Sequence, residues 1–78
     1  MKPGQQPGSL LNSWRRLAGL SQAEVASAVG VSRVAISHWE TGRSAPNGSH
    51  LHALFGVLGL APNQRRAYIA AIADRGQL

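Results

Sequence analysis

The chain has 78 residues, 44% of them hydrophobic and 14% charged, and a chain this short is expected to form one domain around one core. Eight Lys and Arg residues against three Asp and Glu give a net charge of +5, and seven of the eight are Arg, whose planar guanidinium suits phosphates and guanine edges. This balance favours a polyanionic partner over a basic surface that only aids solubility.

Residues 1–8 contain two prolines, two glycines and two glutamines without apolar periodicity, which is typical of a flexible arm. Entry of this arm into a DNA minor groove through Lys2 is the alternative to plain disorder. A folded domain is predicted over residues 9–76. Its first helix follows Ser9 as the N-cap, carries apolar residues at helical spacing from Leu10 to Ala18, and ends at Gly19.

A helix-turn-helix unit is predicted over residues 22–41. Its first helix starts with a capping box, in which the Ser21 hydroxyl and the Glu24 carboxylate each satisfy a free backbone amide. Its second helix starts with Ser32 as the N-cap, and Gly30 allows the chain to reverse between the two helices. The two helices are expected to span Gln22–Val29 and Arg33–Thr41.

Two further helices are predicted, from about Ser49 to Leu58 and from Pro62 to about Asp74. Pro46 and the pair Asn47-Gly48 form a turn-rich connection before the first of them, and apolar residues then repeat at helical spacing. No stretch alternates apolar and polar residues between hairpin turns, as a strand would. The expected fold is therefore all-α, with five compactly packed helices.

The helix over residues 33–41 has an apolar side and a polar side. Ile36 and Trp39 form the apolar side, and Trp14 lies on the apolar stripe of the first helix, so both tryptophans are expected in the core rather than exposed for base stacking. The opposite side offers an arginine for guanine, an imidazole, a hydroxyl, and valine methyls for thymine. The predicted base-contacting residues are Arg33, Val34, Ser37 and His38.

Three runs of the chain resemble a known family. They are residues 20–26 (LSQAEVA), 30–32 (GVS) and 36–43 (ISHWETGR), followed by Pro46, and they are similar to xenobiotic-response-element, or lambda-repressor-like, transcriptional regulators. The resemblance covers about residues 10–60. It implies a five-helix domain that binds operator DNA as a dimer, with the third helix in the major groove. It also implies that Gln22, which opens the second helix, clamps the DNA backbone.

Several polar residues around the third helix are expected to contact phosphate. The helix that Gln22 opens presents free amides and a positive dipole to an anion, and Arg43 follows the third helix where a backbone contact is expected. A solvated surface position is the alternative for both. The resemblance matches Arg15 to the family's arginine on the first helix and Glu40 to its glutamate at the end of the third. Glu40 is therefore expected to form a bidentate pair with Arg15 that ties the first helix to the third. The predicted phosphate contacts are Gln22, Ser32, Thr41, Arg43 and Arg16.

Other charged and histidine positions are less informative. Arg65 and Arg66 lie near the start of the last helix, either as DNA backbone contacts or as solvated charges. His50 and His52 are two residues apart, so they lie on different faces of a helix and do not suggest a metal site. Because there is also no cysteine, no paired carboxylates and no phosphate loop, we expect neither an enzyme nor a metal or cofactor.

The sequence thus predicts a sequence-specific regulator, a repressor, that binds double-stranded DNA. We expect it in the cytoplasm, because the start shows no charged segment followed by an apolar one and no apolar stretch approaches about 18 residues. The alternatives are a protein-interaction module, such as an antitoxin that binds a toxin as well as DNA, and RNA binding, for which no sheet with exposed aromatics is predicted. A homodimer reading an inverted repeat is expected. It is predicted to pair through the fifth helix and the end of the fourth, using the apolar residues Tyr68, Ile69, Ile72 and Leu78.

Overall fold

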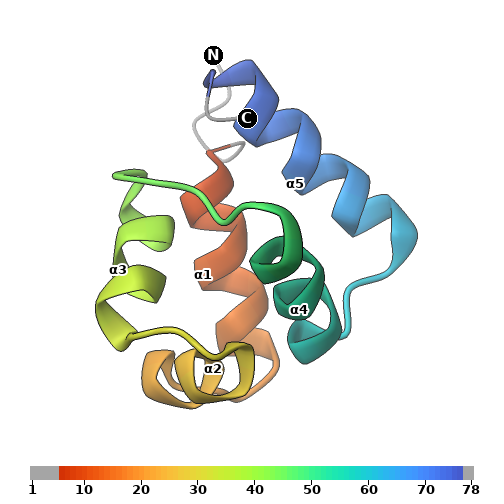
Figure 1. Cartoon of the computed structure of the whole chain (residues 1–78). Helices are drawn as coiled ribbons and strands as arrows, with labels where there is room; N and C mark the ends of the chain where they lie inside the picture. Colours follow the sequence, from red (N-terminus) through yellow and green to blue (C-terminus); the bar gives the residue numbers. More distant parts are fainter. Residues whose placement is uncertain (1–5, 77–78) are drawn as a thin grey trace.

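The computed structural model describes residues 6–76, which form five α-helices and no strand (Figure 1). The predicted all-α, five-helix fold is confirmed, and the second, third and fifth helices have the predicted bounds. No helix in this part of the chain is long and apolar enough to cross a membrane. The flexibility predicted for positions 1–5 concerns residues outside the described range. The helices span Pro7–Leu17 (α1), Gln22–Val29 (α2), Arg33–Thr41 (α3), Gly48–Leu58 (α4) and Pro62–Asp74 (α5).

The helix α1 lies at the centre of the molecule. It packs against α3 and α5, and α2 packs against α3 and α4. In Figure 1, α3 and α5 lie on opposite sides of α1, and α2 runs along the bottom of the molecule, beside the lower end of α3. All five helices turn their apolar sides toward one core, which leaves the outer side of α3 uncovered. The core consists of Leu11, Val25, Ala26, Ile36, Trp39, Leu54, Phe55, Leu60, Tyr68 and Ile72.

Local hydrogen bonds set the bounds of α2 and α3. The Ser21 hydroxyl oxygen accepts from the Glu24 backbone N–H at 3.0 Å, and the Glu24 carboxylate accepts from the Ser21 N–H at 2.8 Å, so the predicted capping box is present. Ser32 Oγ accepts from the Ala35 N–H at 3.2 Å and caps α3 as predicted. Gly30 has φ +90°, a conformation that strains side-chain-bearing residues, and it lets the chain reverse sharply between α2 and α3.

The start of α1 differs from the prediction. The helix begins at Pro7 with Gln6 as its N-cap, and Ser9 lies inside it. Proline is well suited to the first helical position because its φ is already helical and its missing N–H would have no partner there. Pro7 and Gly8, which were expected in the flexible arm, are buried. The folded domain therefore begins before residue 9, and α4 begins one residue earlier than predicted, at Gly48.

The helix α5 contributes more to the core than its sequence suggested. Tyr68 and Ile72 are fully buried, and the Tyr68 ring packs edge-on against Trp14 and Phe55 at centroid distances of 6.4 and 6.2 Å. These two residues therefore cannot form the predicted dimer surface, because the monomer's own core already covers them. Ile69 stays 38% exposed, and Leu78 lies outside the described residues.

Candidate nucleic-acid interface

The outer side of α3 carries a mixed set of side chains that the core does not use. Val34 is 59% exposed and presents its methyl groups at the surface. Arg33 beside it is also exposed, whereas Ser37 and His38 are half-buried along the same side. A guanidinium, methyl groups, a hydroxyl and an imidazole together can match the donors, acceptors and thymine methyls of the major groove.

The two hydroxyl residues at the ends of α3 differ in what they offer a phosphate. Phosphate oxygens only accept hydrogen bonds, so a contact requires a free proton on the protein side. Thr41 donates its hydroxyl proton to the Ser37 carbonyl at 2.9 Å, within its own helix. Ser32 accepts a hydrogen bond as the N-cap, and the structure records no acceptor for its hydroxyl proton among residues 6–76. Ser32 is thus poised to donate, whereas Thr41 would first have to rotate.

Arg15 and Glu40 form the predicted ion pair. Arg15 Nε lies 2.6 Å from Glu40 Oε2, and Arg15 Nη2 donates to Glu40 Oε1 at 3.1 Å, so the pair is bidentate. The two side chains are only 12% and 5% exposed. Arg15 Nη1 also donates to the Leu20 carbonyl at 2.9 Å. The pair therefore joins α1, the α1–α2 turn and the end of α3.

Two neutral amides complete the environment of Glu40. Asn12 Nδ2 and Gln22 Nε2 each donate to Glu40 Oε1 at 3.0 Å. Burial by itself would raise the pKa of Glu40, but the hydrogen bonds from Arg15, Asn12 and Gln22 outweigh it and hold that pKa below its usual value. The hydrogen bond to Glu40 raises the pKa of Arg15 in turn. Glu40 is thus an ionised acceptor that is already occupied, not a residue directed at a base.

Asn12 was not among the residues that the sequence singled out. Its position three residues before Arg15, on the same side of α1, was the available signal. Gln22 was expected to clamp phosphate, and the structure brings its amide next to Asn12 through their shared acceptor. The side chain of Gln22 is half-buried and remains at the surface.

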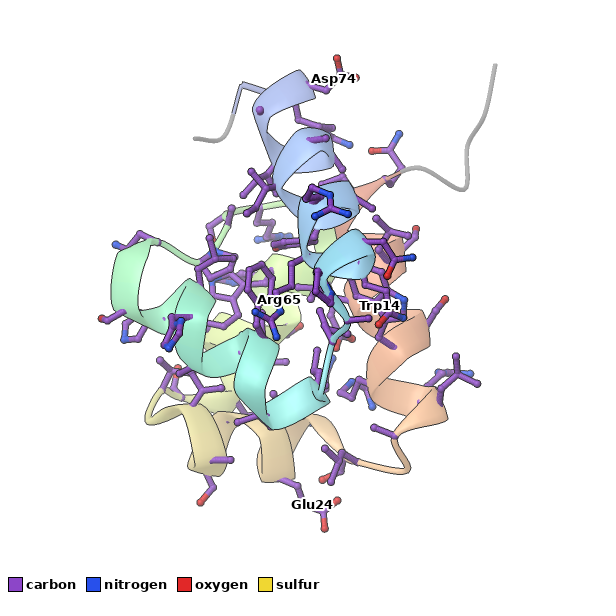
Figure 2. All side chains as sticks on the ribbon, turned by 90° about the vertical axis from the view of Figure 1, so that its right-hand side faces the viewer. Trp14, Glu24, Arg65 and Asp74 are labelled. Carbon is purple, nitrogen blue, oxygen red and sulfur yellow. The ribbon has the colours of Figure 1, made fainter. Side chains whose placement is uncertain are left out.

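The arginines divide between two sides of the molecule. Arg33 and Arg43 lie on and just after α3, and both are exposed. Arg65 instead donates through Nε to the Leu60 carbonyl at 3.0 Å and lies between α4 and α5 (Figure 2). Arg65 and Arg66 both belong to the first turns of α5, and α5 lies on the other side of α1 from α3 in Figure 1.

The carboxylates other than Glu40 lie far from one another. Figure 2 shows Glu24 projecting outward from α2 at one end of the molecule and Asp74 projecting outward from the end of α5 at the other. Within residues 6–76 no three His, Cys, Asp or Glu side chains gather as a metal site would require. His50 instead packs beside Trp39, with ring centroids 6.2 Å apart.

Comparison with known proteins agrees with this geometry. A family model described as helix-turn-helix matches residues 11–64. Repressor protein C2 of Salmonella phage P22 is 39% identical over 59 residues, which are 76% of this chain and 27% of that repressor, so the chain spans about a quarter of its relative. The solution structure of the DNA-binding domain of the P22 c2 repressor is similar with a TM-score of 0.76 at 35% identity, and the match covers 85% of this chain and 87% of that domain. The chain therefore belongs to the helix-turn-helix family of lambda-repressor-like, or xenobiotic-response-element, proteins.

Proposed function

We propose that this protein binds double-stranded DNA sequence-specifically, with α3 in the major groove, and represses transcription. The observation that carries the proposal is the outer side of α3, where Val34 and Arg33 are exposed although the helix is anchored by a buried inner side. The matching relative is named a repressor, and the similar solved domain is described as DNA-binding, which supports the same activity here. The protein acts by binding and not by catalysis.

The proposed base contacts follow from the chemistry of each exposed side chain. Arg33 at the start of α3 donates two parallel hydrogen bonds to a guanine, and Val34 packs against a thymine methyl. Ser37 and His38, one turn further along, contact the neighbouring base pairs. Because these side chains differ in what they bind, together they distinguish one DNA sequence from another.

The proposed phosphate contacts surround this stripe. Ser32 donates its free hydroxyl proton, Gln22 donates from the start of α2, and Arg43 and Arg16 bring positive charge. Thr41 joins them once its hydroxyl turns away from the Ser37 carbonyl. These contacts set the orientation of α3 in the groove and carry no sequence information.

We also propose that two copies bind an inverted repeat and pair through α5, on a surface other than Tyr68 and Ile72. Arg66 and Asp74 are exposed, and neither has an ion-pair partner among residues 6–76. Each lies four residues from Ala70 on the same side of α5, in the region where Ala67, Ala70, Ala71 and Asp74 line a surface hollow. In an antiparallel pair centred on Ala70, Arg66 of each copy faces Asp74 of the other.

Sedimentation with a palindromic duplex tests the pairing. We expect two protein chains per duplex, weakened by Arg66→Glu and restored when Asp74→Arg is added, because the reversed charges again face each other. One chain per duplex for the wild type would disprove the pairing. If the Arg66→Glu variant still bound as two chains per duplex with wild-type strength, pairing through this surface of α5 would be disproved.

Selection of bound sequences from a random duplex pool tests the main proposal. We expect an enriched motif whose half-sites repeat in inverted orientation about one helical turn, roughly 34 Å, apart. A bound pool without any enriched sequence motif would contradict sequence-specific binding. It would favour instead a protein-interaction module such as an antitoxin, in which α3 would need no base-reading residues.

A further inference from the structure

We infer that Asn12 is a second arm of the phosphate clamp, and that Glu40 holds the Asn12 and Gln22 amides side by side so that both bind one phosphate of the DNA backbone. This inference rests on the proposed DNA binding and extends it to a residue of α1. It starts from a single oxygen, Glu40 Oε1, which accepts from Asn12 Nδ2 and from Gln22 Nε2.

The shared acceptor brings two distant parts of the chain together. Each amide nitrogen lies 3.0 Å from Glu40 Oε1, so the two nitrogens are at most about 6 Å apart. Asn12 comes from the middle of α1, and Gln22 is the first residue of α2. A phosphate that reaches the Gln22 amide is therefore within reach of the Asn12 amide as well.

Glu40 also decides which atoms the amides present. A carboxylate accepts hydrogen bonds only, so the NH₂ group of each amide, and not its carbonyl, must face Glu40. Each NH₂ group donates one of its two protons to Glu40. The structure shows no acceptor for the second proton within residues 6–76. Two N–H groups that are held in place and have no acceptor in the protein suit the oxygens of one phosphate.

The charge around the two amides also suits an anion. The Glu40 carboxylate is neutralised by Arg15 at 2.6 Å and is only 5% exposed, so it repels a phosphate weakly. Arg16 is exposed and lies four residues after Asn12, on the same flank of α1. Asn12 is itself half-buried, as a contact residue at the edge of an interface would be.

The test compares Asn12→Ala, Gln22→Ala and the double variant, by fluorescence anisotropy, on a duplex selected by the wild type and on a scrambled duplex. We expect each single variant to weaken binding to both duplexes by the same factor, roughly 10- to 150-fold for one charge-assisted hydrogen bond. The double variant should lose less than the product of the two factors, because the amides share a phosphate. The salt dependence should stay unchanged, since both residues are neutral.

Ser27→Ala is the control, because Ser27 is exposed on α2, lies five residues after Gln22 on another side of that helix, and should leave the affinity unchanged. Melting temperatures are measured first, and binding is then measured well below them, so that a loss of folding is not taken for a loss of contact. In a second arm, wild type and variants bind duplexes in which one phosphate at a time is replaced by a neutral methylphosphonate. The same phosphate should lose its importance in both single variants.

Three outcomes would overturn the inference. The first is an Asn12→Ala protein that melts at a lower temperature but binds as the wild type does, which would make Asn12 only a support for Glu40. The second is a result in which the methylphosphonate substitution that loses its effect lies at a different phosphate for each of the two single variants. Failure of the wild type to bind any duplex would overturn the proposed function together with this inference, whereas the first two outcomes overturn this inference alone.

Discussion

Gly8 of α1 and Glu40 of α3 meet through their backbones. A Cβ atom built on Gly8 would lie 2.2 Å from the Glu40 carbonyl oxygen and 3.0 Å from that of Trp39. Glu40 therefore joins α3 to α1 twice, through its main chain at Gly8 and through its carboxylate at Arg15. The position of α3 depends on both contacts.

Gly8→Ala should destabilise the fold. The added methyl meets backbone atoms that no rotamer change can move, so α1 must shift away from α3, at a cost of about 1–3 kcal/mol or more. Gly56→Ala is the control, because Gly56 is also helical but has no atom within 4 Å of its built Cβ. It should stabilise α4 by roughly 0.5–1 kcal/mol. Urea unfolding of both variants measures the two effects, and equal effects would contradict the close contact.

Glu40→Ala should cost on the order of 3 kcal/mol of stability, because it leaves the mostly buried Arg15 without its carboxylate and removes the acceptor of Asn12 and Gln22. In the DNA-free monomer, Asp74→Ala removes an equal charge from an exposed position and should change the melting temperature little. If Glu40→Ala melted as the wild type and altered the preferred base sequence, Glu40 would be a base-contacting residue instead.

Stability should fall in acid through Glu40. Its pKa is lower in the folded chain than its ordinary value of 4.5, so the ionised carboxylate stabilises the fold at pH above that value. This contribution is lost as the pH falls below 4.5 and through the lower pKa of the folded state. The difference in unfolding free energy between wild type and Glu40→Gln should therefore shrink from pH 7 to pH 3. A difference that is constant over this range would contradict the hydrogen-bonded, ionised Glu40.

Truncation of Arg33 and truncation of Arg43 should impair DNA binding in different ways. Arg33→Ala should cost roughly 1–3 kcal/mol of binding and relax the preference for one base pair, which we expect to be G·C. Arg43→Ala should weaken binding to all duplexes alike and reduce the slope of log affinity against log salt by about 0.9 per subunit. Anisotropy on selected and scrambled duplexes at several salt concentrations measures both. The opposite division would show that α3 does not read the major groove.

The sequence by itself determined the local structure of this protein. The capping box of Ser21 and Glu24, the N-cap Ser32 and the glycine at position 30 act over a few residues, so they placed α2 and α3 at their observed bounds. Apolar spacing also identified Ile36 and Trp39 as core residues and, by exclusion, the outer side of α3. The Arg15–Glu40 pair could be predicted because the resemblance supplied both positions.

The tertiary structure decided what depends on two distant segments meeting. Pro7 and Gly8 were assigned to the flexible arm because a glycine at a close helix contact has the same sequence neighbours as a glycine in a flexible segment. Only the nearby Glu40 carbonyl, which the fold brings to Gly8, shows that this glycine lies at a helix contact. The sequence pattern allowed Tyr68 and Ile72 to lie on the surface. In the folded chain both are buried, and Trp14 and Phe55 pack against Tyr68. Asn12 had no chemical signal of its own, since an amide gains direction only from the acceptor that the fold brings to it.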